Sequence, residues 1–319
     1  MMKQDVVGSH DLRNWLHTML LLGGMLLLLA LLGWLIGGRA GIVWALVLGG
    51  LSLLFGQQAS PQLVLRMYRA RPLTVHEAPR LYQTMDELAR RAALPYVPTL
   101  YYVPSRMLNA FTVGTHRNAA IGLTDGILRG LNLRELTGVL AHEMSHVHNN
   151  DMRAMRLADV VTRITNLFST FGKFMLLFNF PLILMGSYAI SWWAILLLIF
   201  APMLSGLLQL ALSRTREFDA DLDAVQLTHD TVGLMNALQK LEYYSTNIWQ
   251  QVLFPGRGVP DPSILRTHPH TSDRIARLQE LSTQEYQPLL PPEDGPWELP
   301  DHFTRVKQPP GWRMMNWWY

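Results

Sequence analysis

The sequence predicts a mostly helical α+β protein with a small β-sheet and four transmembrane helices arranged in two hairpins. Two observations predict the membrane part. Two long uncharged blocks interrupt the chain, and only 16% of its 319 residues are charged, whereas about a quarter is usual in soluble domains. A third observation predicts the α+β part: short strand patterns lie among amphipathic helices, one of which carries an H-E-x-x-H motif.

The first apolar block predicts a helical hairpin. Residues 15–38 contain no Asp, Glu, Lys or Arg and are long enough to span a bilayer. Arg39 and a glycine-rich turn follow, and residues 40–55 are apolar again. A cleaved signal peptide is the alternative, but no small-x-small cleavage site follows the first run, and the second run begins at once.

The second apolar block, residues 174–213, predicts another hairpin. Its forty uncharged residues suffice for two spans of about 20 residues each. Gly186 and Ser187 offer a turn, and Pro181 and Pro202 would kink helices without excluding them from lipid. A buried soluble hairpin or an interfacial one is the alternative.

The basic residues predict the orientation. All but Arg39 lie on the side of the two termini, so the positive-inside rule places the termini and the soluble part in the cytoplasm. The flanking basic residues are Lys3, Arg13, Arg66, Arg69, Arg71, Arg153, Arg156, Arg163, Lys173, Arg214 and Arg216.

Between the hairpins, the pattern predicts a helix over residues 79–93 and strands over 99–103, 109–114 and 119–123, with Thr124 capping a short helix. A strand edge beside a metal could bind an unfolded peptide by main-chain pairing. The other interpretation of the strand hairpin is a scaffold without a role in binding.

Residues 142–146 read H-E-M-S-H. His142 and His146 lie one turn apart on the same face of a helix. Two imidazole nitrogens can then hold one tetrahedral Zn²⁺, and Glu143 can take a proton from its water. A chance match on an amphipathic helix is the alternative, so the context decides. His148 points away from the ligand face.

The context favours a helix with defined ends. Asn132 is a good N-cap, and Glu135 completes a capping-box pattern. Apolar residues recur at helical spacing after it, and the polar run at 149–151 predicts the end.

A third metal ligand is predicted far downstream. Glu217 and Asp221 are again four residues apart on a predicted helix. Glu217 would complete a His-His-Glu site, and Asp221 could accept the free N–H of one ligand histidine. The alternative is a charged first turn that complements the helix dipole.

The composition limits which residues could bind a metal and which partners are expected. The chain has no cysteine, so a metal must rest on histidine and carboxylate ligands. The formal net charge is only +3, which offers no basic domain for nucleic acid.

After the second hairpin, helices are predicted over 217–228, 231–244 and 273–281, with a long loop over 247–266 that is often a functional feature in a compact domain. The Pro- and Trp-rich tail, residues 286–319, could lie at the membrane interface, pack on the domain or stay disordered.

Taken together, the motifs resemble the HtpX-type family of membrane zinc proteases, which is related to the CAAX-prenyl proteases. The resemblance covers roughly residues 10–285, and the tail has no counterpart in it. The matching segments are 109–114 (N-A-F-T-V-G), 140–146 with Asn149 and Asp151, 213–221, and 267–269 with Arg274 and Ile275.

The resemblance implies a gluzincin-like fold with one Zn²⁺ per chain and Glu143 as the general base. The implied zinc ligands are His142, His146 and Glu217. The implied substrate strand contains Asn109, Ala110, Phe111 and Thr112, and His268 and Arg274 are candidate donors to the oxyanion. His270, which follows His268 and Pro269, departs from the family pattern.

The expected function is zinc-dependent hydrolysis of peptide bonds in misfolded or damaged membrane proteins. Such quality control under stress would take place at the bacterial inner membrane, with the active site facing the cytoplasm. The alternatives are a membrane scaffold or chaperone-like binder with a non-catalytic metal, and a prenyl-protein protease.

The expected organisation has five parts. Residues 1–60 form the first membrane hairpin and 166–213 the second, 61–165 and 214–285 form the two parts of the protease domain, and 286–319 form the tail.

Overall fold

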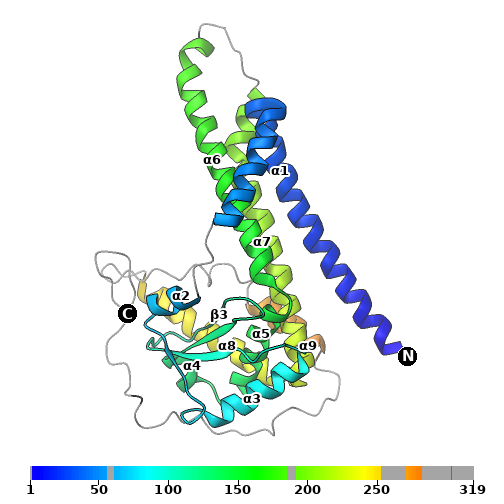
Figure 1. Cartoon of the computed structure of the whole chain (residues 1–319), viewed down its shortest axis with the longest axis vertical. Helices are drawn as coiled ribbons and strands as arrows, with labels where there is room; N and C mark the ends of the chain where they lie inside the picture. The colour runs from blue at the N-terminus through cyan, green and yellow to red at the C-terminus, as the bar shows by residue number, and fades with distance from the viewer. Residues whose placement is uncertain (1, 56–60, 185–191, 253–270, 282–302, 304–319) are drawn as a thin grey trace. The chain divides into compact units, whose positions relative to one another are not determined.

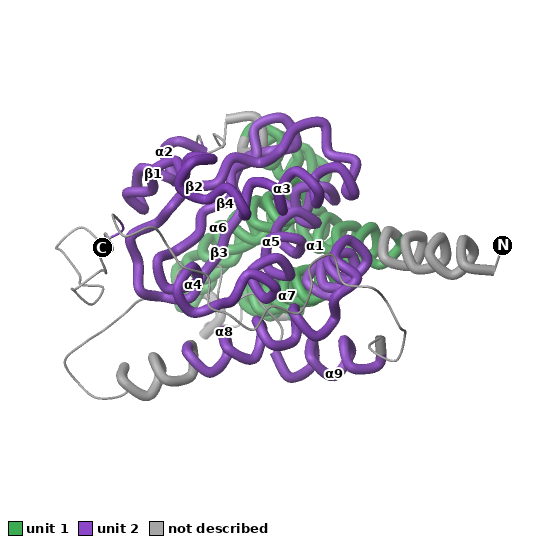
Figure 2. The backbone as a smooth tube through the Cα atoms, turned by 90° about the horizontal axis from the view of Figure 1, so that it is seen from below, with its two compact units in different colours: residues 1–57, 153–215 green, residues 58–152, 216–319 purple. Residues whose placement is uncertain are grey.

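The structure is a computed structural model that describes residues 2–55, 61–184, 192–252, 271–281 and 303. Helices predominate over one small sheet (Figure 1). The chain forms two compact units, residues 1–57 with 153–215, and residues 58–152 with 216–319 (Figure 2). His268 and most of the predicted loop and tail lie outside the described residues.

The first unit is built from three long helices. Helix α1 contains a sharp break, because Gly37 and Gly38 leave helical geometry and Gly38 has a φ of 58° that glycine tolerates best. A β-carbon on Gly41 would collide with the Gly33 carbonyl oxygen, so the two arms of α1 fold back closely on each other. The helices are α1 (Met2–Phe55), α6 (Asp151–Leu184) and α7 (Trp192–Thr228), of which α6 and α7 reach into the second unit.

Two segments within the described residues are long and apolar enough to cross a membrane, Leu16–Leu51 and Trp193–Thr228. The prediction of four spans is therefore wrong in number. The segment Leu16–Leu51 contains both arms of α1, which are separated by the break at Gly37 and Gly38. The described apolar part of α6 after Lys173 is too short to count. The rest of α6 carries charges that lipid disfavours, namely Arg153, Arg156, Asp159 and Arg163.

The outward surfaces of these helices are apolar. Leu27 is 71% exposed, Phe178 78% and Trp193 81%. Monomeric soluble proteins rarely expose large contiguous apolar patches, so this surface is suited to lipid.

The second unit contains a four-stranded mixed sheet in the order β1-β2-β4-β3. Strands β2 and β4 are parallel, and the other two pairs are antiparallel. The three predicted strands are present, whereas β1 was not predicted because two residues carry no alternation pattern. The strands are β1 (Arg71–Pro72), β2 (Thr99–Val103), β3 (Ala110–Val113) and β4 (Ala120–Thr124).

Helices cover this sheet. Thr124 caps α4 through its side chain, and Asn132 with Glu135 forms the predicted capping box at the start of α5. Helix α8 reaches Val252, so the predicted loop is wrong at its beginning. The helices are α2 (Pro61–Met67), α3 (Pro79–Arg91), α4 (Asp125–Gly130), α5 (Leu133–His148), α8 (Thr231–Val252) and α9 (Thr271–Leu281).

Helix α7 runs without interruption through Glu217. The prediction that a new helix begins at Glu217 is therefore wrong, as is the alternative that its acidic residues complement a helix N-terminus. Because Glu217 lies inside a helix, no helix N-terminus lies beside it, and its carboxylate instead meets His142 and His146 of α5.

Candidate metal centre

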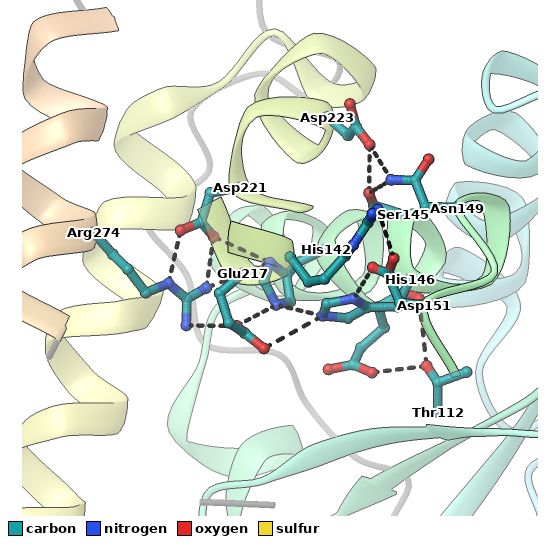
Figure 3. Close-up of polar contacts among 12 residues, drawn as sticks. Thr112, His142, Ser145, His146, Asn149, Asp151, Glu217, Asp221, Asp223 and Arg274 are labelled. Atoms are coloured by element: carbon teal, nitrogen blue, oxygen red, sulfur yellow. Dashed lines mark hydrogen bonds and ion pairs between the residues drawn. The ribbon is translucent and has the colours of Figure 1, made fainter. Parts of the chain in front are cut away.

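Two helices bring three potential ligands together in the second unit. His142 and His146 lie on one face of α5, and Glu217 projects from α7 (Figure 3). Their ligand atoms lie within 4.8 Å of one another. This confirms that the predicted trio is close in space, although its members are far apart in sequence.

The spacing of the ligand atoms fits a tetrahedral metal. The Nε2 atoms of the two histidines are 3.2 Å apart. Glu217 Oε2 lies 3.3 Å from His142 Nε2, and Glu217 Oε1 lies 3.7 Å from His146 Nε2. Zinc bonds of about 2.0–2.1 Å at tetrahedral angles place two ligands roughly 3.3 Å apart. Two imidazoles and one carboxylate therefore fit zinc with a position left for water or substrate.

Each histidine turns its other ring nitrogen to an aspartate. His142 Nδ1 is 3.1 Å from Asp221 Oδ1, as predicted for Asp221. His146 Nδ1 is 2.8 Å from Asp151 Oδ2. These contacts fix the ring orientation and direct both Nε2 atoms inward.

Asp151 as a partner of His146 was missed by sequence reasoning, which had placed it in the polar run that ends α5. It is 3% exposed and begins α6, immediately after a tight turn in which Asn150 has a φ of 55°. The available signal was an acidic residue five positions after the second histidine of the motif.

Two arginines stand behind the aspartates. Arg274 Nε donates to Asp221 Oδ2 at 2.7 Å and its NH2 to Asp221 Oδ1 at 2.5 Å, while its NH1 is 3.3 Å from Glu217 Oε2. Arg216 NH1 donates to Asp151 Oδ1 at 3.2 Å. Each ligand histidine thus belongs to a His–Asp–Arg chain.

These neighbours set the protonation of the metal-free site. Burial and the charge of Arg274 lower the pKa of His142, but its hydrogen bonds to Asp221 and Glu217 outweigh them and raise that pKa to about 9. Burial likewise lowers the pKa of His146, and the hydrogen bond to Asp151 reverses the effect, so its pKa is raised. Metal binding must therefore displace protons from the histidines.

Glu143 follows His142 on α5 and contacts the sheet. Its carboxylate accepts a 2.7 Å hydrogen bond from Thr112 Oγ1 on β3, and it is only partly buried. Of the other predicted strand residues, Phe111 is 5% exposed and packs on Gly122, so it points away from Thr112. Ala110 pairs with Leu123 on β4.

Strand β3 is an edge strand, because among the described residues it pairs only with β4. It lies beside the candidate site, since its Thr112 contacts Glu143. Asn109 precedes it, and Thr124 fixes its main chain. Thr124 Oγ1 accepts from Asn109 N at 3.0 Å, and the Asn109 carbonyl accepts from Thr124 N at 3.2 Å. A held edge beside Glu143 could pair with an extended peptide.

A further cluster fastens α5 to α7. Ser145 Oγ donates to Asp223 Oδ2 at 2.6 Å, and Asn149 Nδ2 donates to the same oxygen at 2.7 Å. Ser145 is one of the two variable positions of the motif. This contact holds the histidine helix against the helix that carries Glu217.

Two further histidines need separate mention. His148 is exposed, as predicted, and is not part of the cluster. His268, a candidate oxyanion donor, lies outside the residues that the structure describes.

Comparisons with known proteins find one family model, several relatives by sequence and a similar solved structure. The sequence model of Peptidase family M48 matches residues 75–282. A Protease HtpX homolog from Burkholderia ambifaria is 34% identical over 289 residues, which cover 84% of this chain and 97% of the relative. Another from Aquifex aeolicus is 36% identical over 277 residues, covering 82% and 91%. The crystal structure of S. mikatae Ste24p aligns with 21% identity and a TM-score of 0.46, over 84% of this chain and 65% of that one.

Proposed function

The chain belongs to Peptidase family M48, and on that premise we propose that it is a membrane zinc endopeptidase in which His142, His146 and Glu217 hold the metal and Glu143 is the general base. That it is a metalloprotease follows from the family. The observation that carries the assignment of residues is the tetrahedral spacing of the three proposed ligands, with Glu143 next to His142 and hydrogen-bonded to Thr112 on the edge strand.

Zinc, when bound, supplies Lewis-acid chemistry that lowers the pKa of water and polarises the scissile carbonyl. Glu143 takes the proton from the attacking water and later delivers one to the leaving amine. Thr112 holds the Glu143 carboxylate in place through its hydroxyl. The position of Glu143 is the first requirement, because a general base can take a proton only within hydrogen-bond reach of it.

Arg274 is better suited to positioning than to stabilising an oxyanion. Its guanidinium is 6% exposed and engaged with Asp221 and Glu217. We assign it to the support of the ligands. His268 is still the candidate for the oxyanion donor. A His268→Ala variant that kept the full kcat would exclude this role.

Substrates are polypeptides, and we infer that they bind as an added strand along β3. Main-chain pairing uses groups that every peptide has, so cleavage would tolerate many sequences. Membrane proteins are the expected substrates, because the catalytic unit shares its chain with two apolar helices. A purified enzyme that cleaved soluble unfolded protein but no membrane protein would contradict this inference.

We further propose that the enzyme resides in a bacterial inner membrane, faces the cytoplasm and degrades damaged membrane proteins. The absence of native cysteine allows a direct test. A single cysteine at Arg39 should react with an impermeant thiol reagent added outside cells, whereas one at Asp86 on α3 should react only after lysis. The reverse pattern would overturn the orientation.

The function itself is tested by pairing metal content with proteolysis. Wild type and Glu143→Gln, purified in detergent and loaded with zinc, are incubated with unfolded casein. We expect about one zinc per chain in both and cleavage by the wild type alone, with a loss of at least about 100-fold in the variant. Glu280→Gln, at an exposed position of α9, is the matched control and should cleave normally.

Equal cleavage by Glu143→Gln would exclude Glu143 as the base. Zinc in both proteins without cleavage by either would favour a membrane binding protein instead.

A further inference from the structure

One residue of the C-terminal segment is built into the core of the second unit. Phe303 is 6% exposed and belongs to the main hydrophobic cluster of that unit. It lies beyond residues 75–282 that match the family. The contact thus involves a residue outside the region that matches the family, and it shares no residue with the candidate metal centre.

The slot that receives Phe303 has three walls. The Tyr102 ring meets the Phe303 ring edge-on, with centroids 4.8 Å apart. The Arg71 guanidinium carbon lies 4.3 Å from the centroid of the Phe303 ring, within the range of a cation–π contact. Arg129 NH2 donates a 2.8 Å hydrogen bond to the Phe303 carbonyl. The slot thus contacts both the aromatic ring of Phe303 and its main-chain carbonyl.

The walls are held by contacts that do not involve Phe303. Arg71 NH1 donates to Glu77 at 2.8 Å. Arg129 Nε donates to both oxygens of Asp125, at 2.9 and 3.0 Å, and the Tyr102 hydroxyl donates to Asp125 at 3.0 Å.

Asp125 is itself 4% exposed. A slot whose charged groups are already paired loses little freedom when an aromatic residue enters it.

The slot lies away from the proposed peptide-binding edge. Arg71 belongs to β1 and Tyr102 to β2, whereas β3 is the strand at the other end of the sheet order. Strand β1 is only two residues long, with its pairing limited to β2 among the described residues. A residue that stacks on Arg71 therefore covers the weak end of the sheet.

We propose that the slot formed by Arg71, Tyr102 and Arg129 is an aromatic docking site, and that its occupant is Phe303 of the same chain. The anchor ties Phe303 to β1, β2 and α4. The same chain is the favoured source because a linked aromatic residue has a high effective concentration at the slot.

A photo-crosslinking experiment tests the contact in the full-length chain. Phe303 is replaced by p-azidophenylalanine, which keeps the aromatic ring, in a mixture of isotopically light and heavy protein. Mass spectrometry should find crosslinks to peptides that contain Arg71 or Tyr102 of the same isotope. Crosslinks between light and heavy chains would assign the slot to a second copy, and crosslinks to lipid alone would remove the site; either result overturns the proposal.

A stability measurement tests whether the anchor supports the unit. Phe303→Ala should lower the melting temperature of the zinc-loaded protein by about 5–10 °C, and Phe303→Leu should lower it less. Zinc content should stay at the wild-type level in both. Tyr243→Ala, which removes a 67% exposed aromatic ring on α8, is the control and should have no effect. An unchanged melting temperature in Phe303→Ala would overturn the anchoring role.

Discussion

At the scale of single residues, the candidate metal centre is surrounded by charged groups that are not among its three proposed ligands. His142–Asp221–Arg274 ends in a buried ion pair, and His146–Asp151–Arg216 ends in a partly buried one. The aspartates orient the rings, and Arg274 favours the charged form of Asp221. The pKa of Asp221 is accordingly lowered, because Arg274 and His142 outweigh the effect of its burial.

Asp151→Asn should weaken zinc binding without unfolding the protein. Asparagine retains an oxygen that can accept from His146 Nδ1, but it loses the charge that pairs with Arg216. We expect the zinc dissociation constant to rise by about 10–100-fold, as measured by competition with a chromophoric chelator. Asp86→Asn on exposed α3 is the control. Wild-type affinity in Asp151→Asn would show that the His146 contact is incidental.

Tyr102 predicts a loss of stability at alkaline pH. Burial, followed by the charge of Asp125 and the hydrogen bond to it, raises the pKa of Tyr102 to about 12 from an ordinary value of about 10. Because the folded pKa is the higher one, the stabilisation is complete below about pH 10 and is lost as the pH rises towards 12. Denaturant unfolding across this interval should show a steeper fall in the wild type than in Tyr102→Phe. Equal falls would contradict the role of this phenol.

At the scale of elements, local patterns predicted most of the soluble part. The strand ranges agree with the structure to within one residue at each end, and both helix caps are present. These features depend on neighbours in the chain, such as the Asn132 side chain that accepts from Glu135 N at 2.8 Å. Patterns that need only neighbours can be read from a sequence.

The capping box of α5 should contribute measurably to stability. Asn132→Ala removes the acceptor for a helix N–H group and should cost about 1 kcal/mol, or a fall of about 2–4 °C in melting temperature. Asn132→Ser keeps a capping oxygen and should recover most of the loss. A difference of less than half a degree between alanine and wild type would mean that packing alone holds the start of α5.

Element boundaries failed where packing or charge overrides local preference. Helix α7 passes through the predicted start at Glu217, and α8 continues into the predicted loop. The number of membrane spans was overestimated because apolar length alone does not show where a helix bends or acquires charge. Gly37 and Gly38 mark the bend in α1. The predicted number of spans also required a full span in α6, whose first half carries charged residues.

At the scale of the whole molecule, the metal would join helices that are remote in sequence. A ligand that binds only the folded state stabilises it by RT ln(1 + [L]/Kd), about 2.7 kcal/mol at a hundredfold excess over Kd. Chelation should therefore abolish proteolysis and lower the melting temperature of the second unit, and added zinc should restore both. His146→Ala should melt at the same temperature with and without chelator. If the chelator left the melting temperature of the wild type unchanged, a metal that bridges α5 and α7 would be excluded.

The sequence by itself determined the peptidase family, the α5 motif, the capping residues and the dependence on histidine and carboxylate ligands in a chain without cysteine. The domain boundaries, the substrate strand and the part played by His268 stay predictions. The motif, the caps and the ligand types could be inferred because helix and strand periodicity and residue chemistry can be read within a short stretch of sequence.

Only the tertiary structure decided how Glu217 meets the two histidines, which aspartate serves which ring, that Arg274 faces the ligands, and that Phe303 occupies a slot beside β1. The physical reason is that each of these contacts joins residues far apart along the chain. Their distance is set by the packing of whole helices and strands, and no local pattern records it.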